Sequence, residues 1–234
     1  MFKKRTGTTD VGKDYEHLYI ANLVLKLVID DDVDNFNLSS NDSQYGSFDD
    51  VVVDIKFKNR TETFAVQLKH IKRAPRIKIE QLNASSGNFS LDKYYENFKN
   101  EPKLFERPIK MVLFTNSKLN DEHINRLKFG KLALCDQDSV LRISKSRGQC
   151  HKFEASEPNL PKYEEFFENL YFYSDQPHVK DLEKCTFEMF KKYFSSSEIT
   201  FREYVHFIHQ WSMKEGEKIA LNKTFMKDVI TLCA

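Results

Sequence analysis

Two runs of β-branched and aromatic residues, separated by a short polar turn, constrain this chain more than any other feature. Residues 48–57 (FDDVVVDIKF) and 63–70 (TFAVQLKH) flank the turn KNRTE. Such runs on either side of a polar turn are typical of a β-hairpin. Because side chains alternate along a strand, Phe64, Val66 and Leu68 are predicted to share one face of the second strand.

A long helix is predicted just before this hairpin. Residues 12–29 read GKDYEHLYIANLVLKLVI, and Tyr15, Leu18, Asn22 and Leu25 recur at helical spacing. That periodicity predicts an amphipathic helix that packs one stripe against the core. An acidic run follows the helix and is expected to form a solvated turn.

The remaining pattern predicts an α/β fold. We expect further strands at residues 35–40, 109–116, 131–136 and 139–144, and helices at residues 90–100 and 120–128. The order of helix, three strands, helix, strand, helix and strand indicates a mixed sheet flanked by helices. Phe and Tyr recur at helical spacing in the last third of the chain. We therefore expect one domain over residues 1–155 and a mainly helical region over 156–234, a possible linker to further domains.

Composition limits the function classes. The 234 residues suit one large domain or a domain with a helical appendage, and 40% hydrophobic with 30% charged residues is ordinary for a soluble globular protein. The net charge of +1 means that any nucleic-acid interface must come from local clustering. The four cysteines form no CxxC pair, which argues against a zinc ribbon or a redox motif and favours reduced thiols in an intracellular protein.

The N-terminal sequence and the apolar runs bear on localisation. The N-terminus is basic but lacks a following apolar run, so it does not read as a signal peptide, and every apolar run is too short to span a membrane. We expect a soluble, intracellular protein in the cytoplasm or the nucleus.

A cluster of polar residues on the hairpin points to chemistry. Gln67 and Lys69 share the face opposite to Leu68, and Asp50 is expected to reach that face from the neighbouring strand. Mg²⁺ (or Mn²⁺) prefers oxygen ligands. The candidate ligands here are the Asp50 carboxylate, the side-chain carbonyl of Gln67 and the backbone carbonyl of Leu68. Lys69 is placed to stabilise negative charge on a phosphate, and Glu16 would complete the site if the first helix packs on the hairpin.

These residues carry a family resemblance. Asp50, followed after a hairpin turn by Gln67-x-Lys69, resembles the PD-(D/E)xK nuclease superfamily. GKDYEHLYIANLVLKL, FDDVVVDI and VQLKH are similar to effector nuclease domains of antiviral defence proteins, namely SAVED-domain antiphage effectors and the N-terminal domains of STAND-type NTPases. GSFDDVVV, FAVQLKH and NFSLDKYYENF also resemble N-terminal regions of large ankyrin-repeat proteins of animals. The resemblance covers about residues 7–120.

The resemblance implies a PD-(D/E)xK (restriction-endonuclease-like) core and an endonuclease that depends on Mg²⁺ or Mn²⁺. It implies four catalytic residues, Glu16, Asp50, Gln67 and Lys69, of which the first three hold the metal. Gln67 stands where the superfamily commonly has an acid, which lowers the negative charge of the site. Asp49 is an alternative to Asp50 as ligand. The implied substrate is double-stranded DNA cut with little sequence specificity, although the residues themselves leave RNA open. The implied setting is antiviral defence, with self-association on activation and no membrane partner.

A basic segment follows the second hairpin strand. It holds four basic residues and only one nearby acid, Glu80, and the basic residues are Lys72, Arg73, Arg76 and Lys78. Their side chains would bind phosphates beside the site. A solvated loop is the alternative interpretation.

Other residues and other functions are weaker candidates. Asp54 shares the face of Asp50, whereas His70, His206 and His209 are interpreted as structural. A nuclease-fold module that binds nucleic acid or self-associates without cutting is the rival function. A restriction-type or transposon-type nuclease that acts alone is a third, and the restriction-type enzyme would cut at fixed sites.

Overall fold

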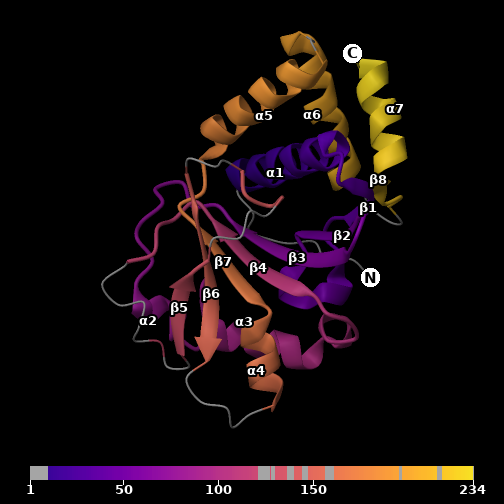
Figure 1. The fold of residues 1–234 in the computed structure, drawn as a ribbon. Coiled ribbons are helices and arrows are strands. Elements are labelled where there is room, and N and C mark those ends of the chain that lie inside the picture. The colour runs from indigo at the N-terminus through magenta and orange to yellow at the C-terminus, as the bar shows by residue number, and fades with distance from the viewer. Residues whose placement is uncertain are drawn as a thin grey trace.

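A mixed β-sheet with helices on both faces makes up the fold of the computed structural model (Figure 1). The structure describes residues 10–120, 127, 130–135, 140–143, 147–155, 161–194, 197–214 and 218–233. In these residues the strands are β1 (Val33–Ser39), β2 (Val51–Phe57), β3 (Thr61–Lys69), β4 (Lys110–Thr115), β5 (Gly130–Leu134), β6 (Gln149–Ala155), β7 (Leu170–Ser174) and β8 (Leu221–Asn222). The α-helices are α1 (Asp10–Ile29), α2 (Ile79–Leu82), α3 (Leu91–Asn100), α4 (Pro161–Glu168), α5 (Val179–Phe194), α6 (Glu198–Met213) and α7 (Lys223–Cys233), and two 3₁₀ segments are η1 (Ser43–Phe48) and η2 (Pro102–Leu104).

The strand order is β5-β6-β7-β4-β3-β2-β1-β8. Strands β1, β2 and β3 form an antiparallel meander, in which Val51 pairs with Val66 and Val53 with Phe64. The predicted hairpin is thereby confirmed. Strands β3, β4 and β7 run parallel to one another, so their carboxyl ends meet at one edge of the sheet. The α/β class and the mixed sheet flanked by helices are confirmed.

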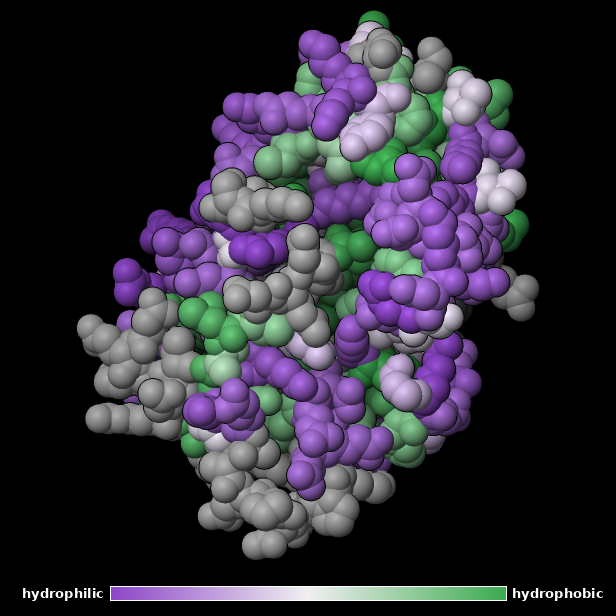
Figure 2. Space-filling view, in the orientation of Figure 1, coloured by the Kyte–Doolittle hydropathy of each residue, from purple (hydrophilic) through white to green (hydrophobic). Residues whose placement is uncertain are grey.

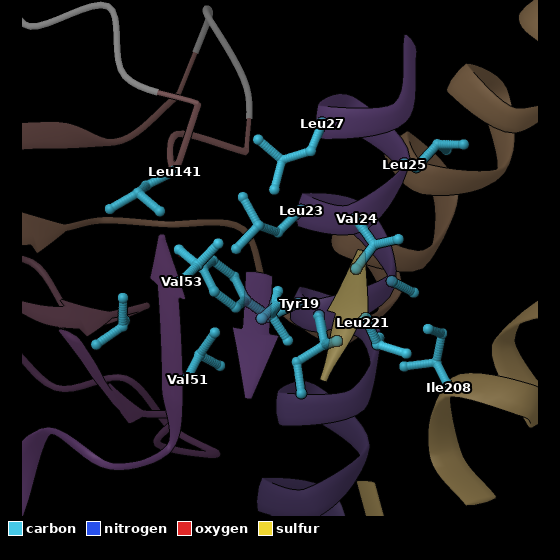
Figure 3. Close-up of a cluster of buried hydrophobic side chains, with 14 of the residues drawn as sticks. Tyr19, Leu23, Val24, Leu25, Leu27, Val51, Val53, Leu141, Ile208 and Leu221 are labelled. Carbon is cyan, nitrogen blue, oxygen red and sulfur yellow. The ribbon is translucent and has the colours of Figure 1, made fainter. Parts of the chain in front are cut away.

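Helix α1 is buried on almost every side, whereas the sequence predicts an amphipathic helix with one buried stripe. Tyr19, Leu23 and Leu27 point toward the sheet, in which β2 carries Val51 and Val53 (Figure 3). On its outer side α1 packs against α5, α6 and α7, which form a helical layer with it (Figure 1). A helix that is apolar all round is expected only where other elements cover it on both sides.

The second face of the hairpin is also covered, which the sequence pattern does not predict. Val52 and Ala65 pack into a hydrophobic cluster with Tyr94 and Phe98 of α3. Helix α3 begins as predicted after its N-cap Ser90, whose Oγ accepts a hydrogen bond from the Lys93 N–H at 3.1 Å. Gln67, which shares the face of Ala65, therefore lies under protein and not on an open sheet surface.

The C-terminal region contributes strands as well as helices. Strand β7 lies between β4 and β6, so the sheet runs across the boundary expected near residue 155. The predicted strand at 139–144 is wrong over its described part, where residues 140–143 form a turn with Leu141 and Ile143 buried. The predicted helix at 120–128 lies almost wholly outside the described residues.

The visible surface is mostly hydrophilic. In Figure 2 hydrophobic side chains show mainly in the seams between elements. Among the helices that the structure describes, none combines the length and the apolar character needed to cross a membrane.

Candidate functional site

The contact between Asp50 and Gln67 is the centre of the candidate site. Asp50 directly precedes β2, and its Oδ2 accepts hydrogen bonds from the Leu68 backbone N–H at 2.8 Å and from the Gln67 side-chain amide. Each of these two polar side chains is only 3% exposed. The two residues are thus brought together as the sequence predicts, but inside the protein and not on its surface.

Glu16 reaches this centre through a residue that the sequence analysis did not single out. Glu16 lies near the start of α1, and its Oε1 accepts a hydrogen bond from the Asn41 side-chain amide at 3.0 Å. The backbone N–H of Asn41 in turn donates to the Asp50 carbonyl at 3.4 Å. Asn41 has a φ of 55°, a left-handed conformation that Asn tolerates better than most residues. Asn41 opens the segment NDSQYG, whose composition is typical of a turn, and this is its only signal in the sequence.

Lys69 ends β3 at the edge where the parallel strands terminate. It is half-buried, and strand alternation places its side chain on the face of Gln67. Thr115 pairs with Lys69 across β3 and β4, and its hydroxyl donates to the Lys69 carbonyl at 2.7 Å. The carboxyl ends of parallel strands are where α/β sheets commonly bind ligands.

An aromatic and amide network fixes the chain just after Lys69. The His70 ring stacks on Tyr15 at 4.6 Å and meets His178 edge to face at 5.8 Å. Asn116 accepts from the Ile71 N–H and donates to the Ile71 carbonyl, both at 2.9 Å, and also contacts His178 Nδ1 at 2.9 Å. Burial, and then the nearby His178, lower the pKa of His70.

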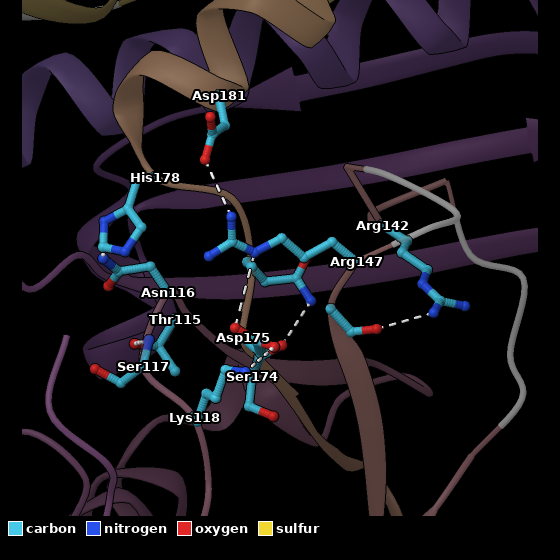
Figure 4. A network of polar contacts seen from close by, with 12 residues as sticks. Thr115, Asn116, Ser117, Lys118, Arg142, Arg147, Ser174, Asp175, His178 and Asp181 are labelled. Atoms are coloured by element: carbon cyan, nitrogen blue, oxygen red, sulfur yellow. Dashed lines mark hydrogen bonds and ion pairs between the residues drawn. The ribbon is translucent and has the colours of Figure 1, made fainter.

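Figure 4 shows part of this network at the ends of β4 and β7. Asn116 and His178 lie beside Arg147, which forms ion pairs with Asp175 at 3.8 Å and Asp181 at 3.0 Å. Lys118 also pairs with Asp175, at 3.2 Å. These cations are therefore matched by acids within the network.

The basic segment lies next to the same sheet edge. Lys72, Arg73, Arg76 and Lys78 are all exposed and form no ion pair with the described residues. Between them, Ile77 is buried and its N–H donates to the Lys118 carbonyl at 2.7 Å. One buried residue thus anchors an otherwise solvated cationic segment beyond β3.

The weaker carboxylate candidates take other partners. Asp54 accepts from the Thr63 hydroxyl at 2.7 Å and pairs with Arg107 at 2.9 Å, on the far part of β2 from Asp50. Asp49 is buried, and its backbone carbonyl accepts from the Asp42 N–H at 3.1 Å. Of the two adjacent acids, it is Asp50 whose carboxylate contacts Gln67.

The two histidines of α6 lie apart from Asp50. His209 packs against His17 of α1, with 4.3 Å between ring centroids, and His206 lies beside it. All three line a pocket of about 360 Å³ between α1, α5 and α6. Burial, followed by the neighbouring His209, lowers the pKa of His17 to about 4.

The fit of a metal ion to the candidate site rests on oxygen donors. In the described part of the chain, no group of three or more His, Cys, Asp or Glu side chains is arranged to hold a metal. Glu16, Asp50 and Gln67 supply two carboxylates and one amide oxygen, a donor set that suits Mg²⁺ because it keeps several waters. Gln67 here turns its amide nitrogen to Asp50, so offering its oxygen requires a half-turn of the amide.

Comparison with known proteins adds no relative. No protein-family model matches the chain, and no curated protein matches its sequence.

Proposed function

We propose that this protein is a metal-dependent endonuclease of the PD-(D/E)xK type, with its site at Glu16, Asp50, Gln67 and Lys69. The contact between the Asp50 carboxylate and the Gln67 amide carries the proposal, because it joins residues that are 17 positions apart. The link from Glu16 through Asn41 to Asp50 supports it further. Lys69, two residues after Gln67, is the last residue of β3.

Each residue has a distinct role in phosphodiester hydrolysis. Glu16, Asp50 and Gln67 would hold Mg²⁺ or Mn²⁺, which when bound supplies a Lewis acid and makes its water more acidic. Lys69 stabilises the negative charge that develops on the phosphate oxygens during attack. Thr115 and Asn41 position the backbone of Lys69 and the carboxylate of Glu16.

The substrate and setting follow from the resemblance and from charge. Lys72, Arg73, Arg76 and Lys78 form no ion pair within the described part of the chain and offer cations for phosphates beside the site, and such contacts do not read sequence. We therefore propose double-stranded DNA, cut with little sequence specificity, with RNA as the alternative. An effector role in antiviral defence, activated by self-association, is proposed on the resemblance alone.

A module that does not cut is the second candidate, and one observation favours it. Asp50 and Gln67 are buried and satisfy each other without a metal, as a purely structural hydrogen bond would. A nuclease must open this contact to admit a metal, whereas a binding module never does.

Metal binding distinguishes these candidates without an activity assay. Isothermal titration with Mn²⁺ should show binding to the wild type and a loss of about 10-fold to 100-fold or more in affinity for Asp50→Asn. Asp54→Asn is the matched control, because Asp54 lies on the same strand but pairs with Arg107. Equal Mn²⁺ affinity for the wild type and Asp50→Asn would place any metal elsewhere and favour the module.

A further inference from the structure

The segment that follows α6 lies alongside the loop at Ser40 and Asn41, and the Asn41 side chain of this loop donates a hydrogen bond to Glu16 of α1. Strand β8 pairs with β1 in antiparallel register, with Asn222 opposite Asn37 and Leu221 opposite Leu38. Continued along both chains, this register brings Lys218 abreast of Asn41. The C-terminal part of the chain therefore supplies a cation close to the proposed metal ligands.

Lys218 is held in place by contacts on two sides. Its Nζ donates to the Ser212 carbonyl at the end of α6 and to the Ser40 hydroxyl at 3.4 Å. It lies 5.8 Å from the centre of the Trp211 ring, and the Trp211 indole N–H donates to the Ile219 carbonyl at 2.8 Å. One ammonium thus connects α6 to the residue that precedes Asn41.

The charge on Lys218 also acts on Glu16. Burial lowers the pKa of Lys218, and the attraction to the Glu16 carboxylate opposes that shift. An ammonium that is half-buried stays charged more readily when such an anion lies near it. Lys218 and Asn41 therefore act together on Glu16, one by charge and one by a hydrogen bond.

We propose that Lys218 is a positioning residue of the candidate site, through which α6 holds the Ser40–Asn41 loop and Glu16 in place for metal binding. The inference rests on the proposed function, because Glu16 matters to metal affinity only if it is a ligand. It also makes the C-terminal region part of the site. Residues that orient metal ligands typically change metal affinity by about 10-fold to 100-fold when they are removed.

Three variants distinguish the effect of the Lys218 charge from the effect of its side-chain shape and from a general loss of stability near the end of α6. Lys218→Met keeps the length and the packing on Trp211 but removes the charge and the donors, whereas Lys218→Arg keeps both. Lys214→Met is the matched control, because Lys214 is an exposed lysine at the C-terminal end of α6, four residues before Lys218. Amide hydrogen exchange of the metal-free proteins and Mn²⁺ titration are measured on the full chain.

Lys218→Met should speed exchange at residues 40–42 about tenfold relative to amides in β3, and weaken Mn²⁺ binding by about 10-fold to 100-fold. Lys218→Arg should retain most of the affinity, and Lys214→Met should match the wild type. Unchanged exchange at residues 40–42 would overturn the inference, as would faster exchange with unchanged Mn²⁺ affinity. A wild type that takes up no Mn²⁺ would overturn the nuclease proposal, and with it the metal role of Lys218, while exchange alone would still show whether Lys218 holds the loop.

Discussion

At the scale of single residues, Gln67 sets the character of the candidate site. Its amide nitrogen donates to Asp50, so the Asp50 carboxylate has a neutral hydrogen-bond partner where a second carboxylate would repel it. Gln at this position therefore favours a stable contact with Asp50, whereas an acid would favour the binding of a cation. This balance between stability and metal affinity is open to a direct test.

Gln67→Glu should make folding depend on metal. Without metal, the buried glutamate cannot donate to Asp50 unless it is protonated, so the free energy of unfolding should fall by roughly 3 kcal/mol. Saturating Mn²⁺ should restore most of that loss, because a metal neutralises both carboxylates. Urea unfolding with and without Mn²⁺ measures both effects. Gln81→Glu is the control, because the Gln81 side chain is exposed and its oxygen accepts a hydrogen bond from the Lys78 N–H, which a glutamate can also accept. A variant as stable as the wild type without metal would show that Asp50 and Gln67 are not coupled.

At the scale of elements, helix α1 joins the candidate site to the helical layer. Three consecutive residues face different neighbours: Tyr15 stacks on His70, Glu16 binds Asn41, and His17 packs on His209. Periodicity predicts the helix itself, and alternation predicts the hairpin, because both depend on residues close in sequence. The apolar residues all round α1 indicate burial, but the helices that cover its outer side, α5, α6 and α7, are more than a hundred residues away, so no local pattern could identify them.

The packing of α1 on α6 should make stability depend on pH through His17. Its pKa is lowered to about 4 in the folded protein, against about 6.5 in an unfolded chain. Between pH 4 and pH 6.5 the unfolded state binds a proton that the folded state does not. The free energy of unfolding therefore keeps its full value above pH 6.5 and falls by ~3 kcal/mol as the pH drops toward 4. Chemical unfolding at pH 7 and pH 4.5 measures this slope. His17→Gln should flatten it, whereas His206→Gln, at an exposed position on α6, should leave it unchanged. Equal slopes for the wild type and His17→Gln would show that His17 is not the source of the pH dependence.

At the scale of the whole molecule, residues from distant parts of the chain lie together at the edge of the sheet where the parallel strands end. Lys69, Thr115 and Ser174 end the parallel strands β3, β4 and β7, and the basic segment lies beside them. The sequence predicts Asp50, Gln67 and Lys69 as a group because one hairpin carries them all. Asn41 and Lys218 could not be predicted, because an irregular turn and a pairing between β1 and β8 bring them to the site.

Plasmid nicking tests the central claim most directly. Wild-type protein with Mg²⁺ or Mn²⁺, at concentrations that allow self-association, is compared with Lys69→Ala and with Lys56→Ala, a change at an exposed lysine of β2. The wild type and Lys56→Ala should cut supercoiled DNA, and Lys69→Ala should be about 100-fold to 1,000-fold slower, because it loses a group that stabilises transition-state charge. Circular dichroism should show that Lys69→Ala keeps its fold. Equal residual cutting by the wild type and by folded Lys69→Ala would contradict the nuclease assignment and leave the binding module as the better account.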